Sequence, residues 1–163
     1  MADNFTTTTP TGFSGNIDLS VLRKKRFTLD GDTGRVLELD TADLSIVQRL
    51  SEASPKLEEL EREVSQITEG VEAKDETVVQ DMDLMASRLK EADGKMRELL
   101  DYIFDSNAAE MCAPNGSMYD PIGGQLRYEH LITILISLYE ENLAKEMKRV
   151  QKRVKSHTAK YTG

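Results

Sequence analysis

Residues 57–104 read LEELEREVSQITEGVEAKDETVVQDMDLMASRLKEADGKMRELLDYIF, and apolar side chains recur along this stretch in steps of three and four. The recurring residues are Leu57, Leu60, Val64, Ile67 and Val71, followed by Val78, Met82, Met85, Leu89, Ala92, Met96, Leu99 and Ile103. Such spacing places them on one stripe of an α-helix. A stripe this narrow is typical of a coiled-coil seam or a helical hairpin.

Two interpretations of the stretch remain open. Gly70 suits a helix end and Asp75 suits the cap of the next helix, which favours an antiparallel hairpin. One line of the stripe nevertheless runs through this region in unbroken sevens, which favours a single long helix with a local defect. The second line of the stripe is interrupted, because the next position in sevens after Leu60 and Ile67 is the charged Lys74. We expect the hairpin.

Composition narrows the class of protein. A length of 163 residues suggests one domain. The composition, with 39% apolar and 31% charged residues, is typical of long solvated helices. The net charge of −8 argues against wholesale nucleic-acid binding. A lone Cys112 fits a reducing compartment. Residues 1–16 lack the apolar core of a signal peptide, and the apolar run 131–138 is shorter than the roughly 20 residues that span a bilayer. We therefore expect a soluble cytoplasmic protein with no membrane partner.

Charge is unevenly distributed along the chain. Residues 52–105 hold 16 acidic and 7 basic residues, whereas residues 144–163 hold 7 basic residues and one acidic residue. One interpretation is two solvated helix faces of opposite sign. The other is a functional basic tail, which would attract the acidic segment within one chain or between copies.

The N-terminal part is predicted to be a flexible arm over residues 1–23, followed by a β-hairpin over 24–40. The arm is rich in Thr and Gly, and it either stays mobile or orders on a neighbouring subunit through Phe5 and Phe13. The hairpin turn falls in DGDTG, residues 30–34. A calcium loop starting at Asp30 is rejected, because Arg35 and Thr41 stand where that motif needs Gly and Glu.

The predicted fold class is mainly α: an N-terminal β-hairpin followed by a helical bundle with long, coiled-coil-like helices. Helices are expected at about 41–53, 55–72, 75–104 and 125–157, in a single domain spanning 24–157 with a frayed tail at 158–163. Ser54 and Pro55 mark a helix restart, or a kink in one continuous helix. Residues 105–124 are predicted to be a loop, because they are rich in Gly, Pro and Asn.

The sequence contains no recognisable set of catalytic or metal-binding residues. Cys112, His130 and His157 are isolated, whereas a metal site needs clustered ligands. No Gly-x-Ser-x-Gly motif accompanies His130, and Gly123–Gly124 does not follow the pattern of a phosphate-binding loop. We predict no catalytic residue, no cofactor and no metal, and hence no enzyme.

Two blocks carry a family resemblance. The first, residues 25–50, includes RFTLDGD, RVLELD and ADLSIVQRL; the second, residues 99–141, includes LLDYIFD, Met111–Cys112, the Gly/Pro-rich loop and a helix opening YEHL. In this order they resemble the small tail assembly chaperones of long-tailed (siphovirus-type) phages and prophages of Gram-positive bacteria. With the helix they flank, the blocks span about two thirds of the chain.

The resemblance implies a non-enzymatic protein of the host cytoplasm, a homo-oligomer whose partner is the tape-measure protein. Such chaperones keep that protein soluble until tail-tube subunits polymerise around it. Residues expected to contact the partner, each of which could instead belong to the core, are Met82, Met85, Leu89, Leu135, Leu138 and Tyr139. The alternative is a self-assembling coiled-coil structural protein. A weaker third reading is a nucleic-acid accessory protein that uses the tail beyond Lys145.

Overall fold

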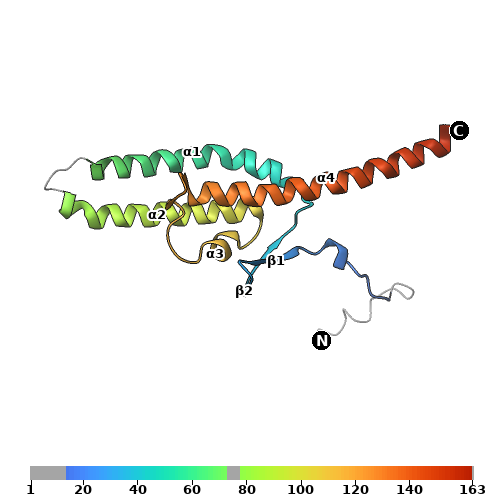
Figure 1. Ribbon diagram of the computed structural model, residues 1–163, viewed down its shortest axis with the longest axis horizontal. Helices are drawn as coiled ribbons and strands as arrows, with labels where there is room; N and C mark the ends of the chain where they lie inside the picture. The colour runs from blue at the N-terminus through green and yellow to red at the C-terminus, as the bar shows by residue number, and fades with distance from the viewer. Residues whose placement is uncertain (1–13, 73–77, 163) are drawn as a thin grey trace, which may run out of the picture.

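Two long helices and half of a third form the body of the protein, as the computed structural model shows (Figure 1). It describes residues 14–72 and 78–162, with side chains over 14–69 and 82–156. The elements in chain order are the 3₁₀ turn η2 (Ser20–Leu22), β1 (Lys25–Leu29), β2 (Asp32–Leu39), α1 (Ser45–Glu72), α2 (Val78–Phe104), α3 (Ala108–Cys112), β3 (Pro121–Ile122), β4 (Gln125–Leu126) and α4 (Arg127–Thr162). The predicted fold class, mainly α with an N-terminal β-hairpin, is confirmed.

Helices α1 and α2 lie side by side as an antiparallel hairpin (Figure 1). This decides between the two interpretations of the apolar stripe in favour of the hairpin. The connection at 73–77, which includes the predicted cap Asp75, lies outside the described residues. The two halves of the stripe face each other, because each helix turns its apolar line toward the other.

Helix α1 is continuous, so the predicted break between 41–53 and 55–72 is wrong. Pro55 lies inside the helix and is exposed, so the carbonyl left without its amide donor can be solvated. Ala53 and Leu60 on either side of it are buried in the core, which holds the helix together across the proline. The helix begins at Ser45 rather than at 41, since the Asp43 carboxylate accepts the Ser45 amide at 2.9 Å and holds a turn there.

Two short hairpins use two-residue turns. Strands β1 and β2 pair antiparallel from Lys25↔Leu39 to Leu29↔Asp32, close to the predicted 24–40. Asp30 (φ 53°) and Gly31 (φ 72°) form the turn with positive φ at both central positions. Strands β3 and β4 were not predicted and pair in the same way around Gly123 (φ 58°) and Gly124 (φ 84°).

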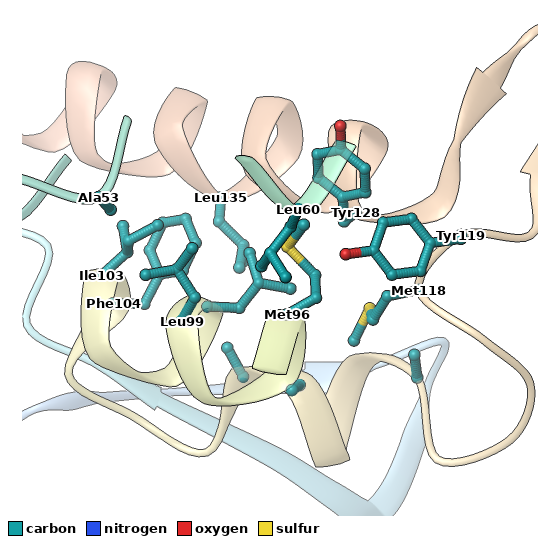
Figure 2. Packing of buried hydrophobic residues seen from close by; sticks show 14 of the residues in the cluster. Ala53, Leu60, Met96, Leu99, Ile103, Phe104, Met118, Tyr119, Tyr128 and Leu135 are labelled. Carbon is teal, nitrogen blue, oxygen red and sulfur yellow. The ribbon is translucent and has the colours of Figure 1, made fainter. Parts of the chain in front are cut away.

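The core lies between the α1–α2 hairpin, the first half of α4, α3 and the inner face of β2 (Figure 2). The rings of Phe104 and Tyr139 pack with centroids 6.0 Å apart, and those of Tyr119 and Tyr128 meet edge to face at 5.7 Å. Burial raises the pKa of Tyr139 to about 12. Each fully buried large side chain contributes roughly 1.5–3 kcal/mol relative to exposure. The largest are Tyr139, Phe104, Leu37, Leu39, Met96, Leu100, Ile103 and Met118.

Both ends of the described chain leave the body (Figure 1). Helix α4 starts at Arg127 and continues to Thr162, so the predicted range 125–157 is displaced and the frayed tail at 158–163 is wrong up to residue 162. Residues 125–126 belong to β4 instead, which sets the start. The N-terminal arm is described from residue 14, and its predicted anchors Phe5 and Phe13 lie outside the described residues.

Candidate helix-binding surface

The seam between α1 and α2 is covered along only part of its length. Met82, Leu89, Met96 and Ile103 are spaced by seven and lie along one side of α2, and the last three of them belong to the core or pack against it. Ile103 and Met96 are fully buried, Leu89 is half-buried and Met82 is 59% exposed. The same apolar line therefore runs out of the core and into solvent toward the tip of the hairpin.

The position of α4 explains this gradient. Its first turn reaches only to the middle of α1, where the Tyr128 hydroxyl donates a hydrogen bond to the Glu61 carboxylate. In Figure 1 the α1–α2 hairpin extends well past the start of α4. We call the surface left beyond α4 the distal face; it comprises Thr68, Met82, Met85 and Leu89, and the buried Val64 borders it.

A hollow of about 290 Å³ lies where the distal face meets the loop before α4. Val64, Thr68 and Leu89 form its helical side, and Gly116 and Tyr119 belong to its loop side. Lys90, Asp93, Ser117 and Asp120 add polar groups to the lining. The hollow has a mixed apolar and polar lining, which is typical of a pocket for an anchoring side chain of a partner.

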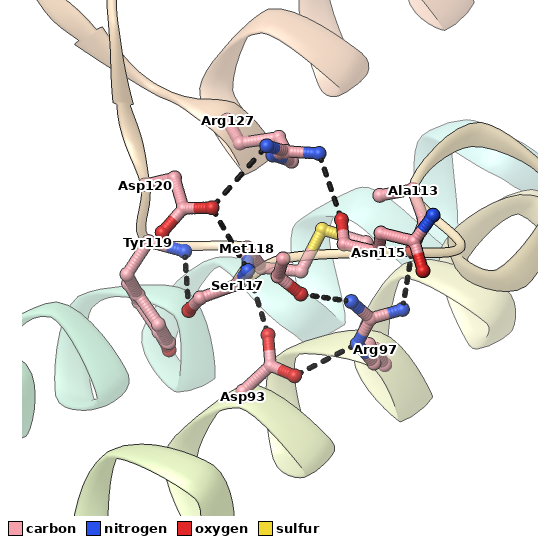
Figure 3. A network of polar contacts seen from close by, with 10 residues as sticks. Asp93, Arg97, Ala113, Asn115, Ser117, Met118, Tyr119, Asp120 and Arg127 are labelled. Carbon is pink, nitrogen blue, oxygen red and sulfur yellow. Dashed lines mark hydrogen bonds and ion pairs between the residues drawn. The ribbon is translucent and has the colours of Figure 1, made fainter. Parts of the chain in front are cut away.

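A polar network fixes the loop wall of this hollow (Figure 3). The Arg97 guanidinium bonds the Asp93 carboxylate and donates to the carbonyls of Ala113 and Gly116, each at 2.8 Å. Asp93 also accepts the Met118 amide at 2.7 Å. The loop is thereby tied to α2 by charge-assisted hydrogen bonds, the stronger kind.

The other end of the loop is tied to α4. The Asp120 carboxylate accepts the Ser117 amide at 2.9 Å and pairs with Arg127 at 3.2 Å. Arg127 also donates to the Asn115 carbonyl at 3.1 Å. Two arginines, Arg97 from α2 and Arg127 from α4, thus hold residues 113–120 in place beside the distal face.

Glu61 and Tyr119, two ionisable side chains that contact Tyr128, have raised pKa values. Burial, together with the charges of Glu129 and Glu58, raises the pKa of the Glu61 carboxyl above its usual range. Burial also raises the pKa of the Tyr119 phenol, whose hydroxyl has no hydrogen-bond partner among the described residues. Tyr119 therefore stays neutral in this setting.

A second hollow, of about 420 Å³, lies between α1 and α2 and is lined by residues of these two helices. Leu60 and Leu99 line it and are each only 7% exposed, while Tyr102 and charged residues line the rest. Two contacts cross it, the Glu63–Lys95 ion pair at 3.9 Å and the Tyr102 hydroxyl to Glu52 at 2.5 Å. This hollow is the larger of the two, but the leucines that line it are already buried, whereas Met82 on the distal face is 59% exposed, so we place the candidate site on the distal face.

The six residues predicted to contact a partner fall into two groups. Met82, Met85 and Leu89 lie together on the distal face. Leu135 and Tyr139 are 4% and 2% exposed and belong to the core, and Leu138 is half-buried against it. The core therefore takes up Leu135 and Tyr139, whereas the first group and part of Leu138, which lines a hollow of about 150 Å³ beside Lys25 and Phe27, remain accessible to a partner.

Sequence reasoning missed the loop residues of the site. Gly116, Ser117, Tyr119 and Asp120 line the hollow, but their segment was predicted as a loop and none of them was predicted to contact a partner. One usable signal was the Asp93–Arg97 pair at i and i+4 on α2, which faces this loop.

The remaining chemistry-bearing residues have structural surroundings. Burial raises the pKa of the Cys112 thiol, which disfavours the reactive thiolate. His130 Nε2 lies 2.6 Å from the Ile122 carbonyl and thereby ties α4 to β3. Within residues 14–72 and 78–162, no group of three or more His, Cys, Asp or Glu side chains is arranged to hold a metal ion. Among these same residues, no helix has the length and apolar character needed to cross a bilayer.

Comparison of the chain with protein-family models, curated proteins and solved structures gave no match.

Proposed function

We propose that this chain is a non-enzymatic assembly chaperone that binds an amphipathic helix of its client on the distal face. The resemblance carried by residues 25–50 and 99–141 points to the tape-measure protein of a long-tailed phage as the client, bound in the host cytoplasm. Chaperone and client would stay together until tail-tube subunits polymerise.

The observation that carries the proposal is the exposure of Met82. It occupies the same apolar line as Met96, which is fully buried, yet it is 59% exposed. Along the covered part of the seam, α4 supplies the third helix. A client helix placed on the uncovered part would complete the same packing, which is the helix-in-groove mode of recognition. Burying side chains of this size contributes roughly 1.5–3 kcal/mol each.

The residue types suit a client that offers many similar helices. Met82 and Met85 have flexible, polarisable side chains that adapt to different partners. Residues 69–91 of the sequence contain seven acidic and three basic residues, a net charge of −4. That charge would keep a complex with an apolar client in solution.

A self-assembling coiled-coil structural protein is the second candidate. The projecting half of α4, with Met147 45% exposed and Val150 42% exposed, favours it. On that reading the chain forms a defined oligomer without a client, and the solubility of the tape-measure protein does not depend on it.

The experiment is co-expression of the full chain with the tape-measure protein of the same phage, followed by recovery of the soluble complex at high salt. Met82→Lys puts a charge on the distal face. Leu84→Lys is the matched control, because Leu84 is similarly exposed (53%) and two residues away but lies off the apolar line. We expect Met82→Lys to weaken client binding at least about tenfold, equivalent to 1.4 kcal/mol, and Leu84→Lys to behave as wild type.

The proposal fails if the tape-measure protein stays insoluble beside the wild-type chain, or if the two variants retain the client equally. Loss of the complex at high salt would instead favour charge-driven binding, as in the nucleic-acid reading, because contacts to phosphate weaken steeply with salt.

A further inference from the structure

The second half of α4 is an amphipathic helix that lies outside the body (Figure 1). Leu143, Met147, Val150 and Val154 follow each other in steps of four, three and four, on one stripe. Leu143 is half-buried against the core, whereas the last three are 45%, 42% and 52% exposed. We call residues 144–162 the α4 extension.

The opposite side of this helix is basic. Six basic residues lie on the helix faces away from the apolar stripe: Lys145, Lys148, Arg149, Lys152, Arg153 and Lys155. Glu146 is the one acidic residue among residues 144–163. The extension therefore combines an apolar stripe with a strongly positive opposite face.

The distal face has the complementary character. It is an apolar seam that lacks its third helix, and it lies in a segment with seven acidic and three basic residues. The uncovered part of α2, residues 78–89, is about 18 Å long at 1.5 Å per residue. The α4 extension is about 28 Å long by the same measure, so it can cover all of it.

We infer that the α4 extension of one copy packs on the distal face of a second copy, and so completes there the three-helix arrangement that α4 forms within its own body. This inference rests on the distal face being a helix-binding surface, as proposed above. The same seam would then bind either a client helix or a neighbouring copy, and client binding would compete with self-association.

Two physical points favour this occupant. The extension is already helical as a continuation of α4, so docking does not pay the cost of helix nucleation. Its charge is opposite in sign to the net charge of residues 69–91 in the sequence, and opposite charges steer the two segments together and disfavour pairing of two basic extensions. Because donor and acceptor surfaces differ, the contact is head-to-tail and can extend from copy to copy.

The test begins with the mass of the full chain by analytical ultracentrifugation as protein concentration is raised. Val150→Glu damages the donor, with Ser156→Glu, an exposed position on the opposite side of the helix, as its matched control. Met82→Lys damages the acceptor, with Leu84→Lys as its control. We expect the wild type and both controls to associate as concentration rises, and each damaged variant to associate at least about tenfold more weakly.

Mixing the two damaged variants is the decisive step. Val150→Glu keeps an intact distal face, and Met82→Lys keeps an intact extension, so a head-to-tail contact predicts a 1:1 complex between two chains that are monomeric alone. If the mixture stays monomeric, or if the wild type is monomeric at every concentration, the inference is overturned. Circular dichroism of each variant establishes that it is folded.

Client binding separates this inference from the proposed function. Val150→Glu leaves the distal face intact and is expected to bind the tape-measure protein as well as the wild type does, or better, because a competitor has been weakened. A wild type that binds the client but never self-associates overturns only the present inference. A client that binds Met82→Lys normally overturns the proposed site itself.

Discussion

Replacing Arg97 is expected to loosen the loop wall of the distal face. The Arg97 guanidinium holds Asp93 and the carbonyls of Ala113 and Gly116 through three contacts of 2.8 Å. Arg97→Met keeps the aliphatic stem and removes all three. It also leaves Asp93, whose side chain is 19% exposed, without its cation.

The magnitude follows from the burial of these groups. Hydrogen bonds to charged groups are worth about 1.5–3 kcal/mol each when both partners are buried. The Arg97 side chain is 24% exposed, and water can reach the released carbonyls. We therefore expect a loss of about 2–4 kcal/mol in the free energy of unfolding, which lowers Tm by about 4–16 °C for a chain of this size.

Urea unfolding followed by circular dichroism measures this change. Arg149→Met is the matched control, because Arg149 is 77% exposed and makes one ion pair with Glu146 at 3.1 Å, a kind of contact worth about 0–1 kcal/mol. Equal losses for the two variants would refute the reasoning, since they would mean that the network does not hold the loop.

Three further substitutions test how individual residues of the helices and of the loop affect stability. Gly94→Ala should raise the free energy of unfolding by about 0.5–1 kcal/mol, because an added Cβ meets nothing within 4 Å and a mid-helix glycine costs entropy; a lower Tm would contradict this. Glu61→Gln should raise Tm at neutral pH but not near pH 4. The pKa of the Glu61 carboxyl is raised in the folded state, so its ionisation costs stability as pH rises through that pKa. The amide oxygen of glutamine still accepts the hydrogen bond from the Tyr128 hydroxyl. A benefit that is independent of pH would be the contrary result. Gly116→Ala should lower stability by about 1–3 kcal/mol, because φ is +83° and the new Cβ would lie 2.6 Å from the Asp120 carboxylate; thermal unfolding at wild-type Tm would dispose of this expectation.

The helical hairpin was predictable from the stripe, but only by a narrow margin. Gly70 and Asp75 indicated a turn, while an unbroken line of sevens indicated one long helix. Local residues cannot decide this, because either arrangement buries the same stripe. Pro55 illustrates the opposite error: its local preference for a helix start was overridden by the burial of Ala53 and Leu60 on both sides.

The candidate site was half predictable. Periodicity placed Met82, Met85 and Leu89 on one stripe, but it could not say where α4 stops covering that stripe. The distinction between Met82 in solvent and Leu135 in the core depends on how far one helix extends along another, which is a tertiary property. The loop wall depends on Arg97 reaching carbonyls 16 and 19 residues away, which sequence spacing does not reveal.

Photocrosslinking from the distal face tests directly whether the client lies on the apolar side of α2. In a Cys112→Ser background, a benzophenone attached at Met82→Cys or at Leu84→Cys reports which side of α2 touches the tape-measure protein, and mass spectrometry distinguishes the client from a second copy. We expect an abundant client crosslink from position 82 and little from position 84. Equal crosslinks from the two positions, or a client crosslink from position 84 alone, would contradict it.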